Sequence, residues 1–277
     1  MLPLFLVSAL LATQALADGN VCANNACRMT PAQKSLTMQL SAFFDFGVTT
    51  MPYCQCSNLL DGNGFTCGFA GFNSASGSIL NVINYYSIAY PDNAFLSDIS
   101  GLGTVSISGS SSIDFFSDLP TNWNATCKDP VFISAQISAN DDQVYNPSQT
   151  AADMLGLVNA VSRAALYDTF MEQGSNNTNP DSAWATIAAT TKSVGGVPAG
   201  VAGTSQHVDE NTWLHAFLQT RRTALLNPSN VNVAAEWASS VGRVDAFMYI
   251  LQSGNVNFTG NSVSTLNIYG IPTVISV

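Results

Sequence analysis

The stretch of sequence that decides the fold is residues 61–72, Asp-Gly-Asn-Gly-Phe-Thr-Cys-Gly-Phe-Ala-Gly-Phe. Asp-Gly and Asn-Gly are strong turn dipeptides, and glycine lets a second backbone or a ligand approach closely. The run from Phe65 to Phe72 is typical of an apolar strand or of one arm of a hairpin. Asp61, at the start, is therefore either a turn residue that caps its own backbone or an acid held rigidly in a cleft.

A second carboxylate, Asp45, precedes the first by sixteen residues, with no acidic residue between them. It follows a segment that begins with Thr30 and Pro31, a capping residue and a first-turn proline, and that has apolar residues at helical spacing. Asp45 is expected at the C-terminal end of this helix, where the macrodipole disfavours a charged carboxylate, as a general acid requires. Two carboxylates that face each other across a groove are the minimal apparatus of glycoside hydrolysis.

The residues after Asp61 resemble the family 46 glycoside hydrolases, the chitosanases. Asp-Gly-Asn-Gly-Phe-Thr is similar to the family's Asp-Gly-Arg-Gly-Tyr-Thr, and the run from Gly71 to its Gly-Phe-Thr-Ser-Gly-Thr-Gly-Asp. The likeness continues in family order through residues 143–147, 166–168, 214–221 and 269–272. The resemblance covers nearly the whole chain and indicates a divergent, fungal-type member. It implies a mainly α fold with a small β element (α+β, lysozyme-like), with two helical lobes around a substrate cleft.

The resemblance also implies roles for the two carboxylates. Asp61 would be the general base of an inverting mechanism, and the Thr66 hydroxyl would help to hold the attacking water. The family's general acid is a glutamate, and Phe44-Asp45-Phe46-Gly47 matches one of its contexts with aspartate in that place. In an alternative alignment without a gap, Phe43 stands opposite the family's glutamate, and the protein then has no general acid. Inversion requires the carboxyl groups to be about 6.5–9.5 Å apart.

Departures from the family concern the residues expected to bind substrate. Asn63 replaces an arginine, and Ser78 replaces an aspartate that contacts a glucosamine amine in the family. Loss of an anionic partner for an ammonium group reduces affinity and selectivity. Asp141 or Asp142, together with Arg221, are expected to supply the ion pairs that tune the acid, and all three are also expected among the residues that bind substrate.

Two functions follow from these residues. The first is a secreted, endo-acting, inverting glycoside hydrolase that cleaves β-1,4-linked, glucosamine-rich polysaccharide (chitosan). The alternative is a catalytically weakened or inactive member that binds cell-wall polysaccharide as a secreted binding or effector protein, which the changes at Asp45, Asn63 and Ser78 favour. A structural cell-wall protein would leave the stretch 61–72 unexplained.

Composition limits the partners. Eighteen acidic residues against eight Lys and Arg give a formal net charge of −10. Nucleic-acid-binding proteins need clustered cations, and an acidic surface also repels anionic lipid. A surface of one sign raises the local concentration of ligands of the opposite sign, so a cationic polysaccharide is compatible. We expect a monomer that needs no cofactor.

Residues 1–17 are predicted to be a secretory signal peptide, with an apolar run and a small-x-small cleavage site at Ala15-Leu16-Ala17. Residues 18–277 then form a single catalytic domain of two lobes, with no membrane span. Six cysteines in an exported chain predict three disulfides, in a pairing that the sequence leaves open. Three glycosylation sequons, at Asn124, Asn176 and Asn257, fit export. No metal site is expected, because Cys54-Gln55-Cys56 is spaced too closely for zinc.

The remaining pattern predicts mostly helices. Long helices are expected over residues 148–174 and 231–252, and a strand-like tail over 264–277. The Gly- and Ser-rich residues 97–119 are expected to form either a loop with strand-like pieces or a connection between lobes. Residues 193–206 are expected to form a mobile loop or lid. Arg163 lies among apolar residues, which predicts a paired cation.

Overall fold

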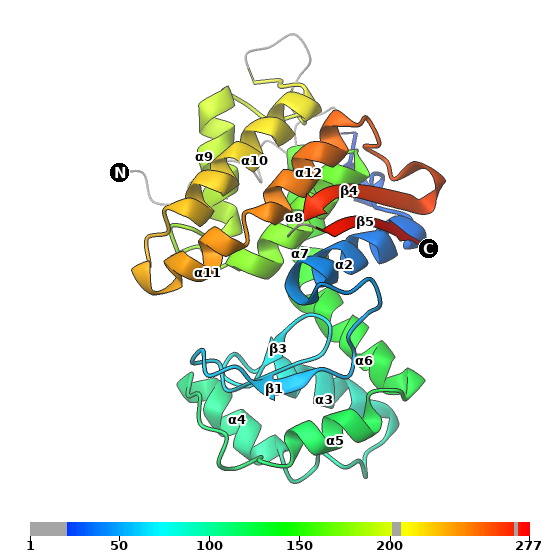
Figure 1. The fold of residues 1–277 in the computed structure, drawn as a ribbon, viewed down its shortest axis with the longest axis vertical. Coiled ribbons are helices and arrows are strands. Elements are labelled where there is room, and N and C mark those ends of the chain that lie inside the picture. The colour runs from blue at the N-terminus through cyan, green and yellow to red at the C-terminus, as the bar shows by residue number, and fades with distance from the viewer. Residues whose placement is uncertain (1–20, 201–205, 269–270) are drawn as a thin grey trace. The chain divides into compact units, whose positions relative to one another are not determined.

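The computed structural model describes residues 21–200, 206–268 and 271–277, and the predicted signal peptide lies outside these ranges. The chain forms two compact units, coloured by residue number in Figure 1. We call residues 46–146 the central unit, and the residues up to 45 together with those from 147 the terminal unit. The architecture is mainly helical with two small sheets, as the sequence predicts.

The terminal unit is a bundle of helices with a C-terminal hairpin. Its helices are α2 (Pro31–Phe46), α7 (Asn146–Leu155), α8 (Ala160–Gln173), α9 (Ala183–Val194), α10 (Glu210–Leu226), α11 (Ala234–Ser239) and α12 (Gly242–Gln252). Most of α8 is buried, with α9, α10 and α12 packed against it (Figure 1). Strands β4 (Ser262–Ile268) and β5 (Ile271–Ser276) form an antiparallel hairpin, and β4 packs on α12. Short 3-10 turns lie at 23–25, 231–233 and 259–261.

Helix α2 begins and ends where the sequence predicts. The Thr30 hydroxyl accepts a hydrogen bond from the Gln33 amide (3.2 Å), and the Gln33 side chain accepts one from the Thr30 amide (2.9 Å), which is a reciprocal cap. Leu36, Leu40, Phe43 and Phe44 are buried. The helix stops before Gly47, which has φ 68°, so Asp45 lies in its last turn.

The central unit contains a three-stranded antiparallel sheet and four helices. The sheet has the order β1 (Cys56–Asn58), β2 (Phe65–Cys67), β3 (Phe72–Asn73), with Thr66 opposite both Ser57 and Asn73. The helices are α3 (Ser78–Ala89), α4 (Ile99–Ser108), α5 (Leu119–Thr126) and α6 (Pro130–Asn140), and a π-helical turn (Asp141–Tyr145) continues α6. The predicted turn at residues 61–64 is confirmed, and it joins β1 to β2 in a hairpin. The run from Phe65 to Phe72, predicted to be one strand or hairpin arm, is instead divided by a turn at residues 68–71 into β2 and the start of β3. Gly64 is required in the first of these turns, because a Cβ at this position would lie 2.2 Å from the Ser74 hydroxyl oxygen.

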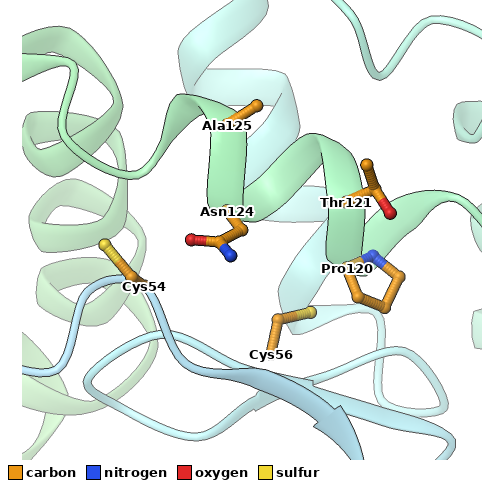
Figure 2. Close-up of a pocket in the computed structure, with 6 residues that line it drawn as sticks. All are labelled: Cys54, Cys56, Pro120, Thr121, Asn124 and Ala125. Carbon is orange, nitrogen blue, oxygen red and sulfur yellow. The ribbon is translucent and has the colours of Figure 1, made fainter.

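Three disulfides join the six cysteines: Cys22–Cys27, Cys54–Cys127 and Cys56–Cys67. The last pair ties β1 to β2, and the second ties the segment before β1 to the end of α5. An open pocket of about 520 Å³ lies between α5 and the segment that carries Cys54 and Cys56 (Figure 2). Figure 2 shows the Asn124 side chain, from the first sequon, extending from α5 toward the segment that carries Cys54 and Cys56. None of the predicted site residues lines this pocket.

Several predicted elements are wrong in detail. Residues 99–108 form helix α4 instead of strand-like pieces, because Leu102 and Val105 are buried at helical spacing and Gly109 supplies the left-handed C-terminal cap. The expected helix 148–174 breaks at Gly156 (φ 73°), and the expected helix 231–252 breaks near Ser240. The predicted lid, residues 193–206, lies partly outside the described residues.

Arg163 is paired as predicted, with Asp153 (2.6 Å) and with the Leu157 carbonyl oxygen (2.9 Å). Within the described ranges, no helix is long and apolar enough to cross a membrane. The same residues hold no group of three His, Cys, Asp or Glu side chains that could bind a metal ion.

Candidate active site

The first candidate carboxylate, Asp45, is held by an arginine from the far end of the chain. Its Oδ1 accepts a hydrogen bond of 2.6 Å from Nη2 of Arg243, in the first turn of α12. The Asp45 side chain is 29% exposed, and that of Arg243 is 3% exposed. The carboxyl group is thus mostly covered but can still be reached from solvent.

Arg243 also binds two acidic residues of α8. Its Nη1 lies 3.3 Å from Oδ1 of Asp168 and 3.0 Å from Oε2 of Glu172. Its guanidinium carbon lies 5.5 Å from the centroid of the Phe44 ring, so the cation is covered by an aromatic face beside Asp45. One guanidinium group therefore joins the end of α2 to the middle of the buried helix α8.

Asp168 is fully buried and has partners on three other helices. It accepts a hydrogen bond of 2.8 Å from the Ser41 hydroxyl of α2, and its Oδ2 lies 2.7 Å from Nη2 of Arg221 on α10. Arg221 is fully buried as well. We call Asp45, Asp168, Glu172, Arg221 and Arg243 the buried charge cluster.

The charges of this cluster balance when Asp45 is protonated and the other two carboxyl groups are ionised. Two guanidinium groups then face two carboxylates, whereas ionisation of Asp45 adds a surplus negative charge in a mostly covered place. Burial raises the pKa of Asp45 above its ordinary value of 3.8; Arg243 opposes this shift, and Asp168 and Glu172 reinforce it.

The pKa shifts of Asp168 and Arg243 favour the charged forms of these two groups. Burial works to raise the pKa of Asp168, but Arg243, Arg221 and the Ser41 hydroxyl outweigh it, so that pKa is lowered and the group stays ionised. Burial works to lower the pKa of Arg243, and the three carboxylates overcome this effect and raise it. The cluster therefore favours the protonated form of the Asp45 carboxyl group and the ionised form of the Asp168 carboxyl group.

The second candidate carboxylate, Asp61, lies on the glycine turn of the central unit. Its Oδ1 accepts the Asn63 backbone amide (2.9 Å) and its Oδ2 accepts the Asn63 side-chain amide (3.0 Å). Gly62 has φ 88°, a backbone conformation that favours glycine. Asp61 therefore caps its own turn and remains exposed to solvent. The bonds that cap the turn also fix the carboxylate in place.

The other predicted site residues of the central unit are positioned by contacts within that unit. Thr66 lies in the middle of β2, five residues after Asp61. The Ser78 hydroxyl accepts the Asn73 amide (2.7 Å) and donates to the Asn73 carbonyl (3.1 Å), so it closes the turn before α3. In the π-helical turn, Asp142 accepts a hydrogen bond from the Tyr85 hydroxyl.

The ion pairs around Asp45 include Arg221, which was expected, and Arg243, which was not. We expected Arg221 and Asp141 or Asp142. Instead, Arg243 contacts Asp45 directly, and Arg221 acts one step away through Asp168. Sequence reasoning missed Arg243, Asp168 and Glu172, although Asp168 lies in one of the segments that resemble the family.

A family model described as Glycosyl hydrolase family 46 matches residues 39–260, which include both candidate carboxylates. The protein is thus a glycoside hydrolase. The chain belongs to glycosyl hydrolase family 46, because this match covers well over half of its length.

Individual relatives agree with this assignment. A chitosanase of Bacillus subtilis (strain 168) is 34% identical over 238 residues, which are 86% of this chain and 83% of the relative. A chitosanase of Streptomyces sp. (strain N174) is 29% identical over 225 residues, 81% of this chain and 74% of the relative.

Solved structures share the fold. A mutant chitosanase from Bacillus subtilis MY002, complexed with 6 GlcN, has a TM-score of 0.81 at 34% identity and matches 90% of this chain and 100% of that chain. The Gynuella sunshinyii GH46 chitosanase in complex with chitotetraose has the same TM-score at 32% identity, with the same coverage.

Proposed function

We propose that the protein is a secreted, endo-acting chitosanase that cleaves β-1,4-linked, glucosamine-rich polysaccharide with inversion at the anomeric carbon. The observation that carries this proposal is the buried charge cluster, which favours the protonated form of the Asp45 carboxyl at the end of α2. The substrate class is supported by relatives that are chitosanases, two of them solved with glucosamine oligomers or chitotetraose.

Asp45 is the general acid. As the glycosidic C–O bond breaks, its proton passes to the leaving oxygen, and the new carboxylate is stabilised by Arg243, already 2.6 Å away. Asp168 and Glu172 share that cation and so keep Asp45 protonated before the reaction. Arg221 is a positioning residue, since it is fully buried and acts through Asp168.

Asp61 is the general base. Its exposed carboxylate takes a proton from a water molecule, whose oxygen forms the new bond to the anomeric carbon. The two amides of Asn63 keep the carboxylate in place without neutralising it, and the Thr66 hydroxyl helps to hold the water. One proton enters Asp61 and one leaves Asp45, so exchange with solvent returns the enzyme to its starting state.

The charge of the central unit fits a cationic polymer. Residues 46–146 contain eight acidic residues and a single cation, Lys128. Such a surface attracts the ammonium groups of chitosan from a distance. We propose Asp141, Asp142, Asn63 and Ser78 as residues that contact bound sugars.

A second function keeps the fold and loses the chemistry: a secreted protein that binds cell-wall polysaccharide without cleaving it. The observation that favours it is Ser78, which replaces a family carboxylate and has its hydroxyl engaged with Asn73. The three disulfides and the exposed sequon asparagines are compatible with secretion in both cases.

The test compares the parent protein with Asp45→Asn and Asp61→Asn, with Asp92→Asn as a control that removes an exposed charge of the central unit. Reducing ends released from chitosan are counted, and the anomer formed first is identified by NMR. We expect losses of about 10²–10⁴-fold for the first two variants and no loss for the control. Binding without turnover in the parent would establish the second function. Retention at the anomeric carbon would refute the role of Asp61.

A further inference from the structure

Leu60 has a backbone conformation that its side chain does not favour. Among the described residues, the non-glycine positions with positive φ are Asn24, Asn25, Leu60, Phe258 and Asn261. Asparagine tolerates this region because its short polar side chain can bond locally. Phe258 is only 2% exposed, so burial of its ring compensates for the conformation. Leu60, at φ 58°, is 87% exposed and has neither compensation.

The folded state therefore gains nothing from a leucine at position 60. In the left-handed region the Cβ of Leu60 is crowded by the following carbonyl oxygen, and its exposed side chain removes almost no apolar surface from water. Glycine or asparagine would adopt the same backbone at lower cost. A strained residue that the packing does not explain points to a role outside the fold.

The turn holds Leu60 in a fixed place beside Asp61. The Leu60 amide donates to the Asn58 side-chain oxygen (2.9 Å), and the Asp61 carboxylate accepts both amides of Asn63. Consecutive Cα atoms lie about 3.8 Å apart, so the exposed Leu60 side chain starts directly beside the Asp61 carboxylate. The preceding residue, Leu59, is also exposed (58%).

The chemistry of this surface selects an uncharged sugar substituent. A glucosamine ammonium placed against Leu60 would lose water without gaining a partner, whereas an acetamide is neutral and offers a methyl group to the leucine. Ser78, the residue expected to meet an amine, has a neutral hydroxyl engaged with Asn73. We infer that Leu60 is a specificity-determining residue that contacts the acetyl group of an N-acetylglucosamine unit bound next to Asp61. The preferred substrate is then partially acetylated chitosan. This inference rests on the proposed function.

The test measures kcat/KM on fully deacetylated and on partially acetylated chitosan, and takes their ratio for each variant. Leu60→Ala removes most of the apolar contact and should lower the preference for acetylated polymer about tenfold. Leu60→Asp introduces a partner for an ammonium and should reverse the preference. Leu96→Ala, which shortens another exposed leucine of the central unit, should leave the ratio unchanged.

Two readouts separate a binding role from a structural one. Leu60→Asn should unfold at the same temperature as the parent or higher, because asparagine tolerates the backbone, and should still lose the preference for acetylated polymer. Sequencing of the products by mass spectrometry should show N-acetylglucosamine beside the cleaved bond in the parent and less of it in Leu60→Ala. Turnover with an unchanged ratio in the Leu60 variants would overturn this inference alone. A parent without turnover on either polymer would overturn the proposed function, and the inference with it.

Discussion

Two neighbouring arginines on α10 offer a direct test of the buried charge cluster. Arg221 is fully buried with Asp168, whereas Arg222 pairs with Asp245 at the surface, where the two side chains are 38% and 58% exposed. Arg221→Met and Arg222→Met remove the same charge from adjacent positions on one helix. The two variants therefore differ in burial and in little else.

The expected loss of stability follows from the partners that remain. Removal of one member of a buried ion pair destabilises a protein by about 3–5 kcal/mol, because the other charge is left uncompensated. Asp168 keeps Arg243 and Ser41 after Arg221→Met, and methionine fills much of the space, so we expect the lower end, about 3 kcal/mol. Exposed ion pairs contribute only about 0.2–1 kcal/mol, so Arg222→Met should lower the free energy of unfolding by no more than about 1 kcal/mol.

Thermal unfolding followed by circular dichroism at neutral pH measures the difference. For a chain of this size, 1 kcal/mol corresponds to about 2–4 °C in Tm, so Arg221→Met should unfold about 6–12 °C below the parent. Arg222→Met should differ from the parent by no more than about 4 °C. Equal transition temperatures for the two variants would show that the Arg221–Asp168 pair does not stabilise the fold, and the description of the cluster would be wrong.

Three further predictions concern pH and salt. Glu172→Gln removes an anion that raises the pKa of Asp45 and leaves Arg243 freer to lower it, so the alkaline limb of the pH–rate profile should move to lower pH; the exposed Glu236→Gln is the control, and an unmoved limb would contradict the role of Glu172. The raised pKa of Asp45 stabilises the folded state at low pH, and this contribution is lost as pH rises from about 4 through the pKa of Asp45 in the folded protein. The free energy of unfolding of Asp45→Asn, measured by urea titration, should therefore increase relative to that of the parent over this pH range. A difference that stays constant with pH would contradict the raised pKa. The KM for chitosan oligomers should rise with salt, because counter-ions screen the acidic central unit, and a KM independent of salt would exclude electrostatic attraction.

Features with a local cause could be predicted from the sequence. The start of α2 depends on Thr30 and Gln33, three residues apart, and its end on Gly47. The turn at Asp61 is set by its own glycines and by Asn63, two residues away. Both candidate carboxylates lie in such segments, which is why they could be located without a structure.

Features that depend on residues far away in the chain could not be predicted from the sequence. Arg243 is 198 residues from Asp45 in the chain, and nothing in its own segment distinguishes it from a surface arginine. The requirement for glycine at position 156 depends on Ala199, whose backbone nitrogen would lie 2.6 Å from an added Cβ. Helix α4 was missed for a different reason: its Gly and Ser residues suggest a loop, and burial of Leu102 and Val105 overrides that preference.

The effect of an aspartate at position 45, where the resemblance expects a glutamate, also depends on residues distant in the chain. Protonation of Asp45 depends on the charge of the whole cluster, because three carboxylates share the neighbourhood of two guanidinium groups. Exchange of one acidic side chain for another at position 45 keeps that balance, whereas removal of a negative charge at Glu172 or Asp168 disturbs it. In the proposed mechanism, the shorter side chain changes where Asp45 delivers its proton, and the cluster still holds that proton before the reaction. Activity should consequently tolerate Asp45→Glu better than Glu172→Gln at high pH, although only the first substitution alters the acid itself.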